Sequence, residues 1–117
     1  MKKTLALLSA AVLAATLTFG AYPNVSFVNQ TKKTAQVTVN YISAVQGSCK
    51  SDVFTVKAGA KDTVKVNRGS CLIKSITVPG AKAFTSTTGT AYSTFGLVQN
   101  ADSSLVVYRF EKNKPVK

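Results

Sequence analysis

Apolar and polar residues alternate along most of the chain after residue 21. In one segment Val37, Val39 and Tyr41 alternate with polar residues, which places the three apolar side chains on one face of an extended strand. The alternation blurs over 42–45. Similar patterns separated by turn residues predict seven short strands, near 25–29, 37–45, 53–56, 63–66, 71–78, 95–99 and 105–110.

The strands at 53–56 and 63–66 are expected to form a hairpin. A short connection with Gly59 near its centre joins them, and glycine suits a tight reversal. The core face of this hairpin would carry Phe54, Val56, Val64 and Val66. The solvent face and the tip would carry Thr55, Lys57, Lys61, Thr63 and Lys65.

Two later segments lack a strand pattern. The polar run 85–90 lies in the weakly patterned stretch 81–94 and is predicted to be a long loop, and the charged tail from Glu111 is predicted to be loose. Hydroxyl-rich loops bordered by aromatic residues often contact carbohydrate or protein. The candidate contact residues of this loop are Thr85, Ser86, Thr87, Thr88 and Tyr92.

Seven short strands with turns about every ten residues are typical of an antiparallel β-sandwich of the immunoglobulin-like type. No segment after Ala21 has the period of a helix. A small β-barrel is the alternative, because the residue pattern alone does not separate a barrel from a sandwich. The predicted fold class is therefore all-β.

The N-terminus matches a bacterial-type signal peptide, residues 1–20. Lys2 and Lys3 precede an uncharged, mainly apolar run, and Thr18 and Gly20 are small residues suited to cleavage before Ala21. An uncleaved membrane anchor is the alternative, since the apolar run approaches the length of a membrane helix. After cleavage, residues 21–117 have the length of one domain, with no span left to cross a membrane.

Export also determines how the cysteines are interpreted. Outside the cytoplasm thiols are oxidised, so Cys49 and Cys71, the two cysteines of the sequence, are predicted to form a disulfide. Closing a loop of this length is worth about 3 kcal/mol in the chain-entropy model. The predicted compartment is the periplasm or the extracellular medium.

Several kinds of chemistry lack their usual residues. The sequence contains no histidine, and its four acidic residues fall at predicted turns or strand ends. The standard hydrolytic triads and a zinc site are therefore excluded, and no enzyme activity, metal or cofactor is predicted. The triplets that begin at Asn24 and Asn29 match the glycosylation acceptor pattern, but a chain with this N-terminus looks bacterial, and in bacteria such a match is usually chance.

Charge is the strongest remaining signal. The sequence has 15 basic and 4 acidic residues, and losing Lys2 and Lys3 with the signal peptide lowers its net charge of +11 by two. Such an excess attracts anionic surfaces. The densest basic region supplies the candidate contacts with a polyanion: Lys50, Lys57, Lys61, Lys65, Arg68 and Lys74.

These features favour a non-enzymatic binding module whose basic face contacts an anionic polysaccharide, lipopolysaccharide or host glycan. Export removes the protein from cytoplasmic nucleic acid, so nucleic acid is not the expected partner. The alternative is a structural or inhibitory protein that binds a protein partner through strand or loop contacts. Lysines that only keep a sheet soluble and protect its edges would give the same composition.

Overall fold

The computed structural model of the protein describes residues 22–43, 49–63 and 68–117. The predicted signal peptide at 1–20 lies outside these residues, as do Lys65 and the two valines that flank it. No helix in the described part of the chain is long and apolar enough to cross a membrane.

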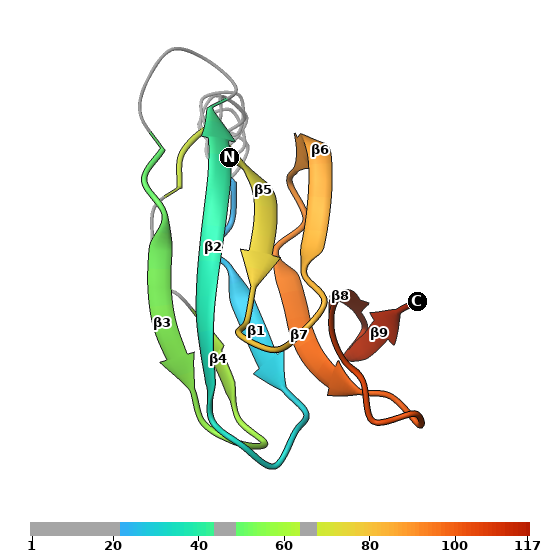
Figure 1. Cartoon of the computed structure of the whole chain (residues 1–117). Coiled ribbons are helices and arrows are strands. Elements are labelled where there is room, and N and C mark those ends of the chain that lie inside the picture. The colour runs from blue at the N-terminus through green and yellow to red at the C-terminus, as the bar shows by residue number, and fades with distance from the viewer. Residues whose placement is uncertain (1–21, 44–48, 64–67) are drawn as a thin grey trace, which may run out of the picture.

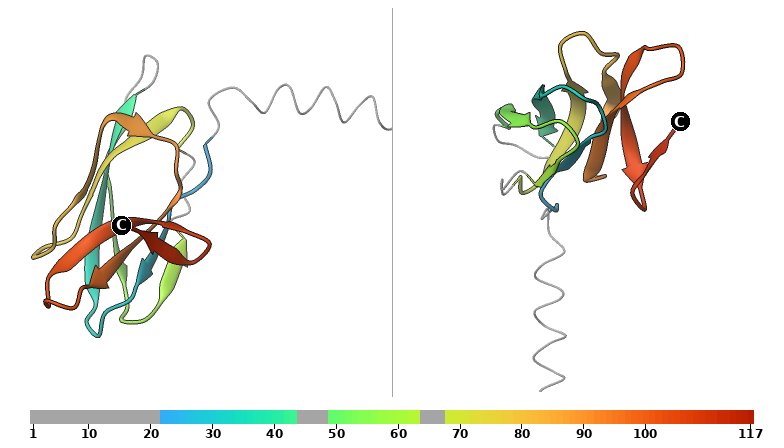
Figure 2. Two further views of the ribbon diagram at one scale, coloured as in Figure 1. Left: turned by 90° about the vertical axis from the view of Figure 1, so that its right-hand side faces the viewer. Right: turned by 90° about the horizontal axis from the view of Figure 1, so that it is seen from below.

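The described residues form nine strands in two sheets, as Figures 1 and 2 show. The strands are β1 (Ser26–Asn29), β2 (Ala35–Ser43), β3 (Asp52–Val56), β4 (Lys61–Thr63), β5 (Cys71–Thr77), β6 (Phe84–Thr90), β7 (Thr94–Gln99), β8 (Leu105–Glu111) and β9 (Lys114–Val116). One sheet has the order β4-β1-β7-β8-β9, and the other has the order β3-β2-β5-β6. This arrangement confirms the predicted all-β sandwich.

The core lies between the two sheets and follows the alternation seen in the sequence. Val37 and Val39 on β2 are fully buried, and Tyr41 packs against the same cluster. The facing sheet contributes Phe27 and Phe95, which are also fully buried. Each such apolar side chain contributes about 1.5–3 kcal/mol when it leaves water.

The sandwich is not purely antiparallel, because β1 pairs in parallel with β7. Phe27 of β1 lies opposite Phe95 of β7, so the beginning and the later part of the domain meet in one sheet. On its other side β1 pairs antiparallel with β4. The N-terminal strand is therefore held between two strands that follow much later in the chain.

The predicted hairpin of 53–56 with 63–66 is wrong for the residues that the structure describes, and 64–66 lie outside them. β3 pairs with β2, whereas β4 belongs to the other sheet and pairs with β1. A turn in which the amide of Ala60 donates to the carbonyl of Lys57 at 3.0 Å, with Gly59 at φ +72°, carries the chain between the sheets. An alternating pattern identifies the buried face of a strand but not its neighbour, and Val56 is fully buried as expected.

The predicted loop at 85–90 is the edge strand β6. Its pairing with β5 is irregular: Ser75 lies opposite Thr85 and Ile73 opposite Thr90, so a single β5 residue faces the four at 86–89. Gly89 has φ +85°, and a Cβ there would lie 2.6 Å from the Cβ of Leu72. Threonine forms strands readily, and a half-exposed edge does not need regular apolar alternation.

The tail is also ordered, contrary to the prediction that it is loose. Lys112 and Asn113 both have positive φ, as in the two-residue turn that joins β8 to β9 in a tight hairpin. β9 covers the outer edge of β8 at its C-terminal end, and Lys82 pairs in parallel with Val106 at the other end. The exposed backbone groups of β8 are thereby satisfied.

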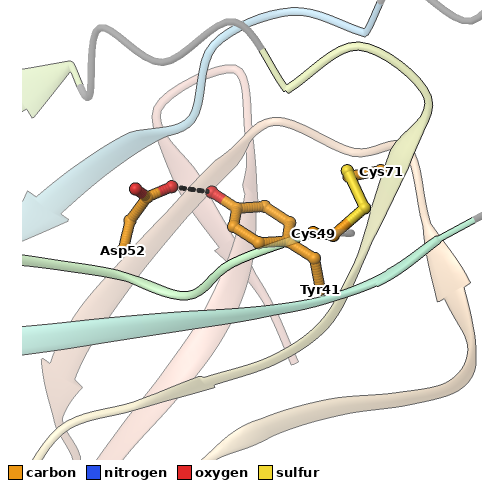
Figure 3. The surroundings of a disulfide bond; sticks show 4 residues. All are labelled: Tyr41, Cys49, Asp52 and Cys71. Carbon is orange, nitrogen blue, oxygen red and sulfur yellow. Dashed lines mark hydrogen bonds between the residues drawn. A yellow bond between two sulfur atoms is a disulfide. The ribbon is translucent and has the colours of Figure 1, made fainter. Parts of the chain in front are cut away.

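The predicted disulfide between Cys49 and Cys71 is confirmed, and no free cysteine remains. It joins the segment before β3 to the start of β5, on either side of β2. Figure 3 shows Tyr41 of β2 beside it, with its hydroxyl donating to Asp52 Oδ2 at 2.6 Å. Burial, followed by this hydrogen bond, raises the pKa of Tyr41 above its usual value.

Replacing both Cys49 and Cys71 by alanine is expected to lower the free energy of unfolding by about 2–5 kcal/mol, because the crosslink restricts the unfolded chain. Urea denaturation of residues 21–117 measures the loss. Alkylation of protein purified without reductant should modify no thiol. An unchanged unfolding midpoint, or two reactive thiols in the wild type, contradicts this expectation.

Candidate functional site

The six basic residues predicted to form one patch are dispersed in the structure. Lys57 and Lys61 flank the β3–β4 turn at one end of the sandwich, the lower end in Figure 1. Lys50 follows Cys49, which is bonded to the start of β5 at the opposite end. Lys74 is exposed on β5, between the two ends. Lys65 lies outside the described residues.

The prediction that Arg68 contacts a polyanion is wrong, because this side chain is 3% exposed and does not belong to the surface. Its Nε donates to the carbonyl of Pro23 at 2.7 Å, and its Nη2 donates to the carbonyls of Ala91 and Tyr92 at 3.0 and 3.1 Å. Burial lowers the pKa of the guanidinium. The side chain joins the segment before β1 to the β6–β7 connection, so the guanidinium stabilises the fold by hydrogen-bonding to backbone carbonyls.

Two further lysines, which the sequence analysis did not select, lie at the same end as Lys57 and Lys61. Lys32 and Lys33 are exposed in the β1–β2 turn. β1 and β3 both run toward the lower end of the sandwich in Figure 1, and β2, which is antiparallel to β3, runs away from it. The β1–β2 turn and the β3–β4 turn therefore both lie at that end. We call Lys32, Lys33, Lys57 and Lys61 the lysine end.

Asn29 holds the two turns of the lysine end together. Its side chain is fully buried, and Nδ2 donates to the carbonyl of Lys33 at 2.7 Å and to that of Val56 at 3.1 Å. Its backbone amide donates to the carbonyl of Ala60 at 2.9 Å. One residue thus contacts the β1–β2 turn, the end of β3 and the β3–β4 turn.

The acceptor side of the Asn29 amide is also used. Oδ1 accepts from the backbone amide of Thr31 at 3.0 Å and from its hydroxyl at 2.7 Å. A side-chain amide offers two donor hydrogens and two acceptor positions, so Asn29 is fully satisfied. The triplet that matches a glycosylation acceptor is therefore a structural turn whose asparagine nitrogen is enclosed by protein.

The lysine end is positive at its surface. The ion pair that the described residues form is Arg109–Glu111, at 3.8 Å, and no carboxylate pairs with any lysine of the lysine end. Asp62 on β4 is exposed beside Lys61 in the sequence, and Asp102 lies in the β7–β8 turn. Hydrogen bonds from the hydroxyl and amide of Ser104 lower the pKa of Asp102.

An open pocket of about 310 Å³ lies beside this end, between the β1–β2 turn and the β7–β8 turn. Most of its lining is apolar, and polar atoms come from both turns. The lining residues are Thr31, Lys32, Lys33, Gln99, Ser103 and Leu105. Sequence reasoning did not place these residues together, because two turns that are far apart in the sequence have to meet before the pocket exists.

The loop-contact candidates lie elsewhere. Thr85, Ser86, Thr87 and Thr88 belong to the edge strand β6, and Tyr92 is 54% exposed in the β6–β7 connection. The guanidinium of Arg109 lies 4.1 Å from the centre of the Tyr92 ring, a favourable cation–π contact. These residues are not brought to the lysine end.

Comparison of the chain with protein-family models, with curated proteins and with solved structures found no match. Within the described residues, no three side chains of the types that commonly hold metals gather at one place. The arrangement that the geometry offers is therefore a positively charged surface beside a small pocket.

Replacing Asn29 by alanine is expected to lower the free energy of unfolding by about 1–3 kcal/mol, because buried carbonyls lose their donor. Thermal or urea unfolding measures the change, and amide exchange should accelerate in both turns. Asn24→Ala is the matched control, since Asn24 is exposed and surface changes cost within about 0.5 kcal/mol. Equal stability of the two variants would contradict the role assigned to Asn29.

Proposed function

We propose that the protein is an exported, non-enzymatic binding module whose lysine end contacts an anionic polymer of the cell envelope or of a host surface. The observation that carries this proposal is the convergence of Lys32, Lys33, Lys57 and Lys61 on two turns joined by one buried asparagine. Within the described residues, no carboxylate pairs with any of these four ammonium groups.

The magnitude of single contacts favours a polymer over a small anion. An exposed ion pair is worth about 0–1 kcal/mol, so one lysine would hold a free anion only weakly. Four lysines on connected turns can engage successive charges of one polymer, and their shared support lowers the entropy lost on binding. Anionic polysaccharide, lipopolysaccharide and host glycans have this repeated charge.

The compartment is part of the same proposal. A disulfide between Cys49 and Cys71 is what an oxidising environment produces, and the pattern of residues 1–20 is that of an export signal. Periplasmic or secreted protein meets envelope polymers before it meets nucleic acid. Anionic saccharide is therefore the favoured class of partner.

A protein partner is the second candidate, and the open strand edges favour it. Within the described part of the chain, the outer edges of β3 and β6 pair with no other strand. Val53 on β3 is 60% exposed, and β6 carries no charged side chain. Such edges can accept an extended segment of another protein as an added strand.

Changing Lys32, Lys33, Lys57 and Lys61 together to glutamine is expected to abolish retention of residues 21–117 on immobilised heparin or lipopolysaccharide at about 0.15 M salt. The control changes four exposed lysines elsewhere to glutamine, namely Lys50, Lys74, Lys112 and Lys114, so the two variants have the same net charge as each other. It should elute close to the wild type. Circular dichroism checks that both variants fold.

Equal loss in the two quadruple variants would show that net charge alone matters and would contradict a specific lysine end. A wild type that ignores both polyanions at about 0.15 M salt, where surface charges are strongly screened, overturns the proposal. A protein partner bound through strand edges then becomes the better explanation.

The exported form is expected to begin near Ala21, because Thr18 and Gly20 present small residues to the cleaving enzyme. N-terminal sequencing of protein from the periplasm or the medium measures this directly. Intact Met1 in a membrane fraction would instead support the anchor.

A further inference from the structure

The pocket beside the lysine end offers positive charge, hydrogen-bonding groups and apolar surface, and one class of ligand matches all three. Lys32 and Lys33 supply positive charge, and no carboxylate in the described part of the chain pairs with either. The side-chain amide of Gln99 and the hydroxyl of Ser103 line the same pocket and have no hydrogen-bond partner among the described residues. They remain available to donate to and accept from a ligand.

The apolar part of the pocket is formed on a stable support. Leu105 packs against the core, and most of the lining is apolar. The β7–β8 turn is closed by a hydrogen bond from the amide of Ser103 to the carbonyl of Asn100 at 2.9 Å. The opposite wall is the turn that Asn29 and Thr31 hold. A ligand with carbon–hydrogen faces and hydroxyl groups matches both parts of this lining.

Size and charge narrow the ligand further. A volume of about 310 Å³ is at the lower limit for small-molecule sites, so the pocket accommodates one sugar ring, either free or as one unit of a longer chain. Two lysines line it, so the pocket favours an anionic ligand. The carboxylate of an acidic sugar supplies that charge.

We infer that the pocket binds a single carboxylated sugar unit, with Lys32 and Lys33 at the carboxylate and Gln99 and Ser103 at the hydroxyl groups. The inference rests on the proposed function, because such a unit would be part of the anionic polymer held at the lysine end. It adds a site that distinguishes acidic saccharides from neutral ones.

The test is a nuclear magnetic resonance titration of ¹⁵N-labelled residues 21–117 with D-glucuronate as the probe. We expect shifts in the amides of Gln99, Ser103 and Leu105, and much weaker shifts with D-glucose, which lacks the charge, or with hexanoate, which lacks the hydroxyl groups. Comparable shifts with either of these two probes, or no shifts in the pocket with glucuronate, overturn the inference.

Two variants separate recognition in the pocket from general attraction. Gln99→Ala is expected to weaken glucuronate binding about 3–10-fold, the range of one lost hydrogen bond. Gln36→Ala is the matched control, because Gln36 is exposed on β2 outside the pocket lining. Equal affinity in the two variants contradicts hydroxyl recognition by Gln99.

The outcomes also separate this inference from the proposed function. Changing Lys57 and Lys61 to glutamine should weaken polymer retention and leave glucuronate binding unchanged. Retention of polymer without glucuronate binding overturns the pocket and leaves the function standing. Glucuronate binding without polymer retention at about 0.15 M salt overturns the function and supports the pocket. Competition with hyaluronan oligosaccharides or with lipopolysaccharide identifies a host or an envelope source of the sugar.

Discussion

The buried side-chain amide of Asn29 is the interaction on which the basic end of the molecule depends. A polar group without water is costly unless it is fully hydrogen-bonded, and this amide meets that condition with Thr31, Lys33 and Val56. The same bonds decide where two turns lie relative to each other. The hydrogen bonds of Asn29 therefore also set the distance between the lysines of the β1–β2 turn and those of the β3–β4 turn.

Arg68 shows that the formal charge of a chain is a poor guide to its surface. The guanidinium is buried and uses backbone carbonyls as partners, and one nitrogen, Nη1, has no hydrogen-bond partner in the described structure. A charge held in this way stabilises the junction of distant segments and is screened from solvent partners. Positive charge at the surface therefore comes mainly from lysines, whose ammonium groups lie in water at turns and strand edges.

The sequence predicted what depends on local pattern and missed what depends on topology. The faces of β2 and the disulfide followed from alternation at Val37 and Val39 and from the cysteine count. The pattern did not show that β3 and β4 belong to different sheets. Lys32 and Lys33 were missed for the same reason, because the β1–β2 and β3–β4 turns are seen to be neighbours only once the strand order of the two sheets is known. β6 was missed because a threonine-rich edge resembles a loop in composition.

The parallel pairing of β1 with β7 governs the order in which the domain can assemble. Phe27 of β1 lies opposite Phe95 of β7, so β1 cannot complete its pairing until a segment near the C-terminal end of the domain is present. Contacts between residues this far apart in the chain form slowly, because closing the long loop costs conformational entropy before the contacts stabilise the fold. Until β7 is available, β1 has a free backbone edge on that side. The sandwich consequently cannot be completed until the chain through β7 is present, so the part of the chain before β7 stays incompletely folded until then.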